Sequence, residues 1–175
     1  MASAAPAIVV MGVAGSGKSL LGRLLAARCG WPFIEGDDHH SPRNREKLAK
    51  AIPLTDADRS AWLDAIAAEL VRGPLERPVI VACSALKRAY RDRLREAGRP
   101  VALLHLTAEA DVLKRRLDTR EGHFVSSALL QSQLDDLEPP GIDETTVMLD
   151  ASQTPERLLE SAIAALRSLA PNAAC

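Results

Sequence analysis

Residues 11–19 read Met-Gly-Val-Ala-Gly-Ser-Gly-Lys-Ser, and this stretch constrains the fold more strongly than any other. Gly12, four further residues and then Gly17, Lys18 and Ser19 form the G-x-x-x-x-G-K-[ST] pattern of a phosphate-binding loop. Residues 7–11, just before it, are an apolar, β-branched run that suits a buried strand. Leucines follow at helical spacing, at positions 20, 21, 24 and 25. The pattern therefore stands in its proper context, between a strand and a helix.

The chemistry of this loop predicts a bound nucleoside triphosphate with Mg²⁺. Glycines let the backbone point its N–H groups at a phosphate chain, and the new helix adds the positive end of its dipole. Lys18 would reach the β- and γ-phosphates, and the Ser19 hydroxyl would ligate Mg²⁺. The alternative is a glycine-rich turn with an incidental lysine, which the flanking strand and helix disfavour. The expected nucleotide contacts are Gly12, Val13, Ala14, Gly15, Ser16, Gly17, Lys18, Ser19 and Leu20.

The composition indicates one globular domain over residues 1–175, with 47% hydrophobic and 26% charged residues. A formal net charge of -1 gives no basic field for nucleic acid or a membrane surface. The sequence has neither an apolar run long enough to span a bilayer nor a signal peptide. Cys29, Cys83 and Cys175 are widely separated, which argues against a disulfide framework or a metal cluster and fits a reducing cytoplasm. We therefore expect a cytoplasmic protein without nucleic-acid or membrane partners.

Apolar strands alternate with helical segments along the chain, which predicts a parallel sheet covered by helices on both faces. The expected strands are residues 7–11, 32–35, 78–83, 101–106 and 145–149. The expected helices begin near Lys18, Ser41, Thr55, Ser84, Thr107, Ser126 or Ser127, and Thr154. Ligands of such sheets bind beyond the carboxyl ends of the strands. The residues that follow each strand are therefore the candidates for a site.

Polar residues follow the second expected strand. Asp37 could orient an attacking hydroxyl group and take its proton. His40 comes just before the next helix, and Asn44 and Lys47 share one face of that helix. Together they suit an acceptor site for a polar molecule. The alternative is a solvated loop in which Asp37 is a capping carboxylate.

Acidic residues are missing after the third strand, where residues 83–85 occupy the place of a Walker-B aspartate. This argues against a GTPase or a motor ATPase. Ser84, Lys87, Arg88 and Arg91 instead offer donors for an anionic acceptor, and Lys87 is the best placed because it is nearest the strand end. A solvated helix surface is the expectation for Arg91, Arg93 and Arg95.

After the fourth strand, Arg116 and Arg120 lie four residues apart on one helix face and lead into a break at residues 121–125. A mobile cationic flap that closes over phosphates needs this combination. Lys114 and Arg115 point elsewhere and are expected to be solvated. The alternative role for Arg120 is to interact with the dipole at the end of its helix.

Several stretches beyond the loop resemble bacterial gluconokinases of the phosphate-loop type. The matching motifs are G-D-x-x-H…N-x-x-K at residues 36–47, P-L-x-D-x-D-R-x-x-W-L at 53–63, C-S-A-L-K…Y-R-D…L-R at 83–95, R-L-x-x-R-x-G-H-F at 116–124 and L-E-P-P at 137–140. The resemblance covers residues 7–169. The departures are small: Leu48 stands where methionine is usual, and residues 38–39 fill variable places.

The resemblance implies a three-layer α/β sandwich, in which a five-stranded parallel sheet forms a P-loop kinase fold with a small lid at residues 120–126. Helices within residues 41–72 would bind the acceptor. It implies transfer of the γ-phosphoryl group of ATP to the 6-hydroxyl of D-gluconate, with Mg²⁺ as cofactor, and usually a homodimer. The implied catalytic residues are Lys18, Asp37, Arg116 and Arg120, with Ser19 on the metal. The implied gluconate contacts are Asp37, His40, Asn44, Arg59, Ser84, Lys87 and His123.

Two other functions stay open from the residues alone. A shikimate or nucleotide kinase would share the fold, and fold does not fix substrate. Nucleotide kinases need a base pocket, which an aromatic content of 3% disfavours. A nucleotide-gated regulatory module is the second alternative, and the missing Walker-B aspartate counts against it. For the gluconokinase interpretation, adenine contacts are expected from the backbone of residues 150–155.

Overall fold

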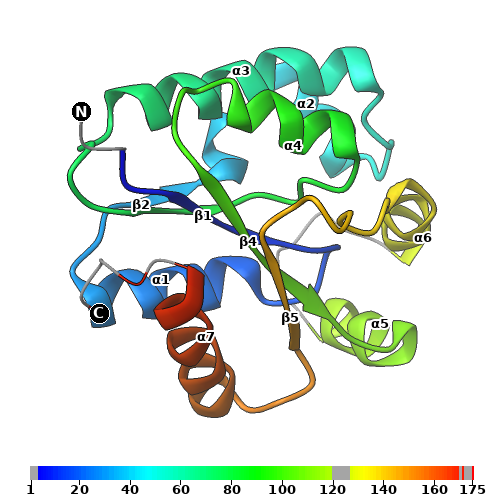
Figure 1. The fold of residues 1–175 in the computed structure, drawn as a ribbon. Coiled ribbons are helices and arrows are strands. Elements are labelled where there is room, and N and C mark those ends of the chain that lie inside the picture. Colours follow the sequence, from blue (N-terminus) through cyan, green and yellow to red (C-terminus); the bar gives the residue numbers. More distant parts are fainter. Residues whose placement is uncertain (1–3, 120–126, 170, 172–174) are drawn as a thin grey trace.

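The computed structural model describes residues 4–119, 127–169, 171 and 175. Five parallel strands form one sheet in the order β2-β3-β1-β4-β5 (Figure 1). The strands are β1 (Ala7–Met11), β2 (Phe33–Glu35), β3 (Val79–Ala82), β4 (Val101–Thr107) and β5 (Thr146–Asp150). The predicted five-stranded parallel sheet is confirmed.

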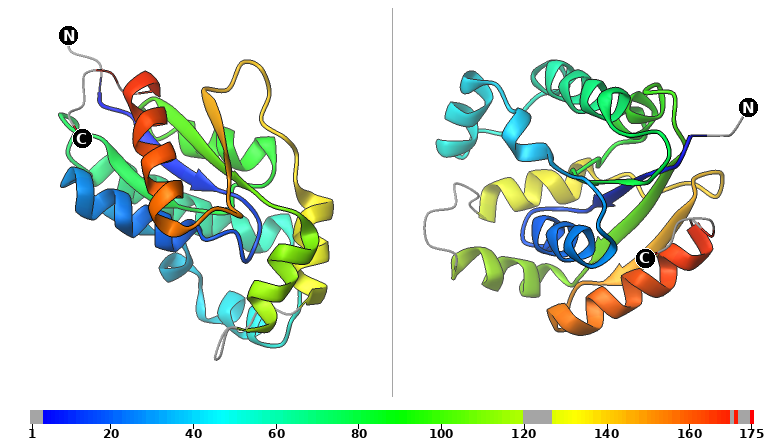
Figure 2. Two further views of the ribbon diagram at one scale, coloured as in Figure 1. Left: turned by 90° about the horizontal axis from the view of Figure 1, so that it is seen from below. Right: turned by 90° about the vertical axis from the view of Figure 1, so that its left-hand side faces the viewer.

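Helices cover both faces of this sheet (Figure 2). One face carries α3 (Asp56–Arg72) and α4 (Arg88–Arg95), and the other carries α1 (Lys18–Cys29) and α7 (Pro155–Leu169). The remaining elements are the 3₁₀ helix η1 (Gly36–His39), α2 (Pro42–Ala49), α5 (Ala110–Asp118) and α6 (Ser127–Asp136). The three-layer α/β sandwich is therefore confirmed. Within the described ranges, no helix combines the length and apolarity that crossing a bilayer requires.

Two apolar cores lie on opposite faces of the sheet, and β1 contributes to both. Val9 packs with Trp62 and Ile66 of α3 in the first core. Ile8 packs with Leu21 of α1 in the second. Every residue of β1 and β3 is buried because helices cover both faces, which explains why these strands read as continuous apolar runs.

A third, smaller apolar cluster anchors the phosphate loop. Val13 and Ala14 of the loop pack with Leu113 and Leu117 of α5 and with Leu130 of α6. Helix α5 follows the end of β4, and the right-hand view of Figure 2 shows α5 and α6 side by side. The phosphate loop is thus anchored by α5 and α6 as well as by its connection to β1.

Two expected helix starts are wrong. The helix expected from Ser84 begins at Arg88, because Ala85 has a positive φ of 45° that interrupts helical geometry. The helix expected from Thr107 begins at Ala110. Thr107 instead extends β4 by one residue: it pairs with Asp150, and its carbonyl accepts a hydrogen bond from the Ala151 N–H at 2.8 Å.

The expectation of solvated arginines on α4 is wrong for Arg91. Its side chain is fully buried and donates to both carboxylate oxygens of Glu144, at 2.8 and 2.9 Å. Arg95 is half-buried and donates to Glu144 at 2.6 Å. Arg93 is exposed, as expected. Burial of Glu144 disfavours its charged form and acts to raise its pKa. Hydrogen bonds from Arg91, the Gly141 N–H and Arg95 outweigh the effect of burial and lower the pKa of Glu144 to about 2.

The expectation that the cysteines form no disulfide is also wrong. Cys29, at the end of α1, is bonded to Cys175. No local pattern indicates this pair, because 146 positions separate the two residues. Cys83 is free and buried, and burial raises the pKa of its thiol to about 12.

Candidate active site

The phosphate loop connects β1 to α1 as the sequence predicts. Gly12 has φ 142°, and a Cβ there would lie 2.7 Å from the Leu106 carbonyl oxygen, so only glycine fits this turn. Gly17 caps α1 without a side-chain hydrogen bond, and no acidic residue lies in the first turn of the helix. The first N–H groups of α1 are therefore left for an anion. Lys18 folds back over the loop and donates to the Val13 carbonyl at 3.0 Å.

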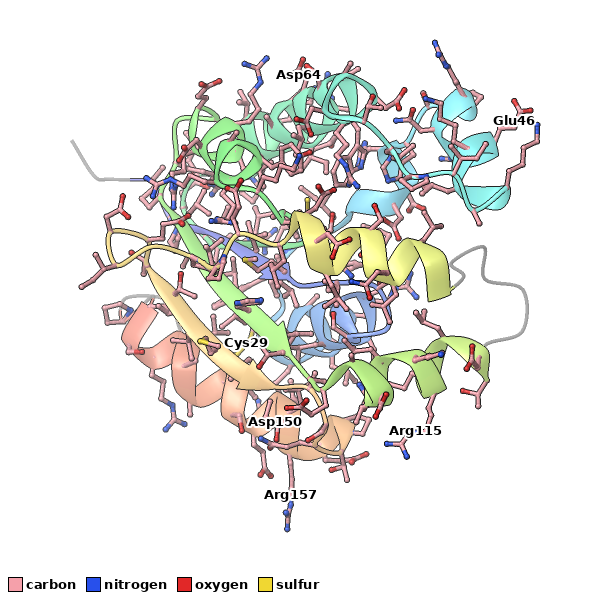
Figure 3. The ribbon with its side chains drawn as sticks, turned by 90° about the vertical axis from the view of Figure 1, so that its right-hand side faces the viewer. Cys29, Glu46, Asp64, Arg115, Asp150 and Arg157 are labelled. Carbon is pink, nitrogen blue, oxygen red and sulfur yellow. A yellow bond between two sulfur atoms is a disulfide. The ribbon has the colours of Figure 1, made fainter. Side chains whose placement is uncertain are left out.

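Two cavities meet at this loop, and both are lined by Gly15 and Gly17. The first, of about 290 Å³, lies between α1, Arg116 and the segment that follows β5. Its further lining is largely apolar: Ser16, Leu20, Leu21, Leu24, Ala151, Gln153, Pro155 and Leu158. The segment expected to contact adenine therefore lines a cavity beside the phosphate loop. Arg116 is half-buried on the same wall, whereas Lys114 and Arg115 are exposed, as predicted; Figure 3 shows Arg115 pointing outward.

The second cavity, of about 420 Å³, runs from the phosphate loop toward η1 and α3. Besides Ala14, Gly15 and Gly17 of the loop, six of the predicted site residues line it: Lys18, Ser19, Asp37, His40, Arg59 and Ser84. They come from four different parts of the chain, which the parallel sheet brings to one edge. The Ser84 carbonyl also accepts a hydrogen bond from the Gly12 N–H at 3.3 Å, which joins the end of β3 to the phosphate loop.

Asp37 is held at the cavity by the packing of η1. Gly36 precedes it, and a Cβ at Gly36 would collide with the Ala82 carbonyl oxygen of β3. The Gly36 carbonyl accepts a hydrogen bond from the Trp62 indole N–H at 2.7 Å. These contacts fix the backbone, while the Asp37 side chain stays 78% exposed. Asp37 thus has a fixed backbone, and its carboxylate has room for a ligand.

His40 is a buried, neutral imidazole on the wall of the same cavity. Its ring stacks on Trp62 with centroids 4.5 Å apart. Burial lowers the pKa of His40 to about 4, Asp37 opposes this shift and Arg59 adds to it. His40 Nδ1 is buried and has no hydrogen-bond partner among the described residues. Such a group is rarely left unpaired in a native structure, so it favours a polar ligand at this place.

Arg59 is the buried cation of the cavity. Its side chain is 7% exposed and lies 3.9 Å from the Asp136 carboxylate, and its guanidinium stacks over the Tyr90 ring at 5.7 Å. Arg59 Nε has no hydrogen-bond partner within the described ranges. A guanidinium suits bidentate binding of a carboxylate, so this position favours an anionic ligand.

Asn44, Lys47 and Lys87 make contacts within the protein instead of lining this cavity, as far as the described residues go. The Asn44 amide donates to the Asp58 carbonyl at 2.7 Å, and Lys47 pairs with the Asp58 carboxylate at 2.6 Å. The predicted shared face of Asn44 and Lys47 is therefore confirmed, and it ties α2 to the start of α3. Lys87 pairs with Asp56 at 2.8 Å and Asp136 at 3.4 Å, and the bond to Asp56 raises its pKa.

Arg120 and His123, with the whole predicted lid at residues 120–126, lie outside the described residues. The sequence interpretation also missed a residue that the structure brings to the cavity. Gln133 of α6 lines it and accepts a hydrogen bond from the Ala14 N–H at 2.7 Å. The available signal was its position: Gln133 stands between Leu130 and Leu137 at helical spacing, a polar residue on an apolar face.

Comparison with known proteins finds similar sequences and structures over most of the chain. The sequence profile described as an AAA domain matches residues 8–140. A gluconokinase of Gluconobacter oxydans is 43% identical over 158 residues, which cover 89% of this chain and 88% of that protein. The thermoresistant gluconokinase of Escherichia coli is 38% identical, over 91% of this chain and 92% of that protein. The crystal structure of a gluconokinase from Sinorhizobium meliloti superimposes with a TM-score of 0.87 at 47% identity, over 98% of this chain and 97% of that one.

Proposed function

The chain belongs to the gluconokinase family, and from that premise we propose that it transfers the γ-phosphoryl group of ATP to the 6-hydroxyl of D-gluconate. The observation that carries the proposal is the junction of two cavities at one phosphate loop. One cavity is apolar and suits a nucleoside. The other holds a carboxylate, a neutral imidazole and a buried guanidinium, which suit an anionic polyol.

The nucleotide would lie along the first cavity with its phosphates on the loop. Leu20 and Leu24 offer an apolar wall to adenine, opposite Gln153 and Pro155. The loop N–H groups and the N-terminus of α1 would hold the β- and γ-phosphates. Arg116 would add a positive charge from the wall of the same cavity. The γ-phosphate would then face the second cavity, where the acceptor would bind.

The residues present fit a Mg²⁺ ion bound mainly through the nucleotide. Among the described residues, no group of three or more His, Cys, Asp or Glu side chains could hold a metal alone. Mg²⁺ needs no such cage, since it is commonly bound by one or two side chains, waters and substrate phosphates. The Ser19 hydroxyl lines the second cavity next to Lys18 and would be its protein ligand. When bound, the ion would neutralise charge on the β- and γ-phosphates.

Gluconate would place its carboxylate at Arg59 and its 6-hydroxyl at Asp37. The Arg59 guanidinium keeps hydrogen-bonding capacity: among the described residues, only the Asp136 carboxylate lies within 4.0 Å of it, at 3.9 Å, and Arg59 Nε has no hydrogen-bond partner. His40 and Ser84 would pair with hydroxyl groups between the two ends. A neutral imidazole suits this role, since it both donates and accepts.

The chemistry is an in-line displacement. Asp37 accepts the proton of the 6-hydroxyl, and the hydroxyl oxygen forms a bond to the γ-phosphorus. The bond from that phosphorus to the β–γ bridging oxygen breaks, and ADP leaves with the electron pair. Lys18 stabilises the negative charge that develops on the transferring group and the leaving oxygen. Most of the rate acceleration would come from this positioning and charge neutralisation.

The test is an ADP-release assay with a panel of acceptors. We expect turnover with D-gluconate that exceeds turnover with shikimate, other sugar acids and nucleoside monophosphates by orders of magnitude. Hydrolysis of ATP without an acceptor should be slow, which separates a kinase from a nucleotide-gated module. Equal or higher turnover with shikimate or a nucleoside monophosphate would contradict the proposal.

A further inference from the structure

Gln133 is a polar residue of the second cavity to which the reaction described above gives no role. It lies on the face of α6 that packs against the phosphate loop and α5, where its neighbours at helical spacing are Leu130 and Leu137. In Figure 3, α6 runs across the front of the molecule beside α5. A glutamine at such a position normally has a specific hydrogen-bond partner.

The contact with the phosphate loop fixes the orientation of the Gln133 amide. Ala14 is 8% exposed, and its N–H donates to Gln133 Oε1 at 2.7 Å. An N–H group needs an acceptor, so the carbonyl oxygen of the side chain must face the loop. The contact with the loop therefore uses the amide oxygen and leaves the NH₂ group of Gln133 unused. Among the described residues it has no acceptor, although Gln133 lines the cavity that holds Asp37, His40 and Arg59.

We propose that Gln133 is an acceptor-binding residue, which donates a hydrogen bond from its NH₂ group to an oxygen of the acceptor other than the one that is phosphorylated. The inference rests on the proposed function, because it takes gluconate as the acceptor. Gluconate suits this role, since every carbon outside the reacting end carries an oxygen that can accept. With Oε1 held by the phosphate loop, the bond ties the position of the acceptor to the loop that holds the γ-phosphate.

The competing explanation is purely structural: Gln133 only satisfies the buried N–H of Ala14 and shapes the loop. Two variants separate the explanations. Gln133→Glu keeps an acceptor for the Ala14 N–H but removes both donors, and Gln133→Met removes acceptor and donors at similar volume. Gln131→Met is the matched control on the same helix, because Gln131 is exposed and its amide donates to Asp135.

The experiment compares kcat/KM of the wild type and the variants on gluconate, on its deoxy analogues with one hydroxyl missing, and on gluconamide. For gluconate we expect Gln133→Met to lower kcat/KM about tenfold or more, the scale of one lost hydrogen bond. One analogue lacks the oxygen that accepts the hydrogen bond from Gln133. For that analogue, the kcat/KM values of the wild type and Gln133→Met should agree within about twofold. Gln133→Glu should show its smallest deficit with the same analogue, and Gln131→Met should match the wild type throughout.

The inference is overturned if the ratio of wild type to Gln133→Met is the same for gluconate and every analogue, or if Gln133→Glu matches the wild type on gluconate. Either result would assign Gln133 to the loop alone. Failure of the wild type to phosphorylate gluconate is a different outcome and would overturn the proposed function itself. Thermal unfolding of each variant checks that the fold is kept; should Gln133→Met not fold, Gln133→Glu decides.

Discussion

His40 combines three properties that seldom coincide in one residue: it is buried, it is neutral, and it faces a polar cavity. Stacking on Trp62 removes it from water, which lowers its pKa to about 4. In the unfolded chain the same imidazole titrates near its ordinary value of 6.5. The unfolded state therefore binds a proton more readily than the folded state between these two values.

His40 should make the fold sensitive to mild acid. Its contribution to stability is complete above pH 6.5 and is lost as the pH falls toward about 4. The free energy of unfolding should decrease over this range by about 3 kcal/mol through His40. Urea unfolding at a series of pH values would measure this. His40→Gln should flatten the curve in this window; an equally steep curve in the variant would show that other groups, such as His105, account for the dependence.

Asp37 is the residue on which the chemical step depends. Asp37→Asn keeps the size and one acceptor oxygen but cannot take the proton of the hydroxyl group. We expect kcat to fall by about 10²-fold or more, with nearly unchanged ATP affinity, because the phosphate loop is intact. Steady-state kinetics and nucleotide titration measure the two quantities. If high Mg²⁺ restored the activity of the variant, Asp37 would instead orient a water on the metal.

The sequence predicted the location of some residues correctly and of others wrongly, and the difference has physical reasons. Lys18 and Ser19 were predicted from the spacing of the loop motif, and Asp37 and Ser84 from their places close after a strand, where a parallel sheet places its ligands. The structure brings all four to the second cavity. Arg91 was assigned to the surface because nothing local distinguishes it from Arg93 on the same helix. Its partner Glu144 is 53 positions away, and only the tertiary fold brings the two together.

At the scale of elements, the buried Arg91–Glu144 pair connects α4 to the segment between α6 and β5. Arg91 also donates to the carbonyls of Ala85, Leu86 and Glu138, at 3.1, 2.9 and 3.1 Å. The Glu138 carboxylate in turn accepts from the N–H of Arg88 at the start of α4, at 2.6 Å. These contacts explain why α4 starts at Arg88, and why its start could not be predicted from local sequence.

Loss of the charge on Glu144 should destabilise this connection strongly. Glu144→Gln leaves Arg91 as a buried cation without a counter-charge, which typically costs about 3–5 kcal/mol. The adjacent Asp143→Asn is the matched control, because its pair with Arg88 is exposed and should contribute less than about 1 kcal/mol. Denaturant unfolding of both variants at neutral pH compares them. Equal effects of the two substitutions would refute the special role of the buried pair.

At the scale of the whole molecule, the parallel sheet and the three layers followed from the alternation of apolar runs and helices, whereas the strand order β2-β3-β1-β4-β5 came from the structure. The Cys29–Cys175 disulfide did not, since it joins the end of α1 to the far end of the chain. Spacing rules for cysteines apply to clustered residues, and these two are brought together only because α7 packs beside α1. The homodimer implied by the family resemblance stays a prediction.

The state of the thiols can be counted directly. In protein purified without reductant, no thiol should react with Ellman's reagent, because Cys29 and Cys175 are joined and Cys83 is buried with its pKa raised to about 12. Denaturation without reductant should release the Cys83 thiol alone. Three reactive thiols under those conditions would show that Cys29 and Cys175 are reduced in the purified protein.

The central claim is that the phosphoryl group passes from the loop to the 6-hydroxyl of gluconate in the second cavity. Phosphorus NMR of the wild-type enzyme with ATP, Mg²⁺ and D-gluconate tests this most directly, because it identifies both the product and the oxygen that received the group. We predict a phosphomonoester signal split by the two protons of a terminal CH₂ group, which appears as fast as ADP. Inorganic phosphate as the sole new signal, or a phosphoryl group on another gluconate oxygen, would contradict the account.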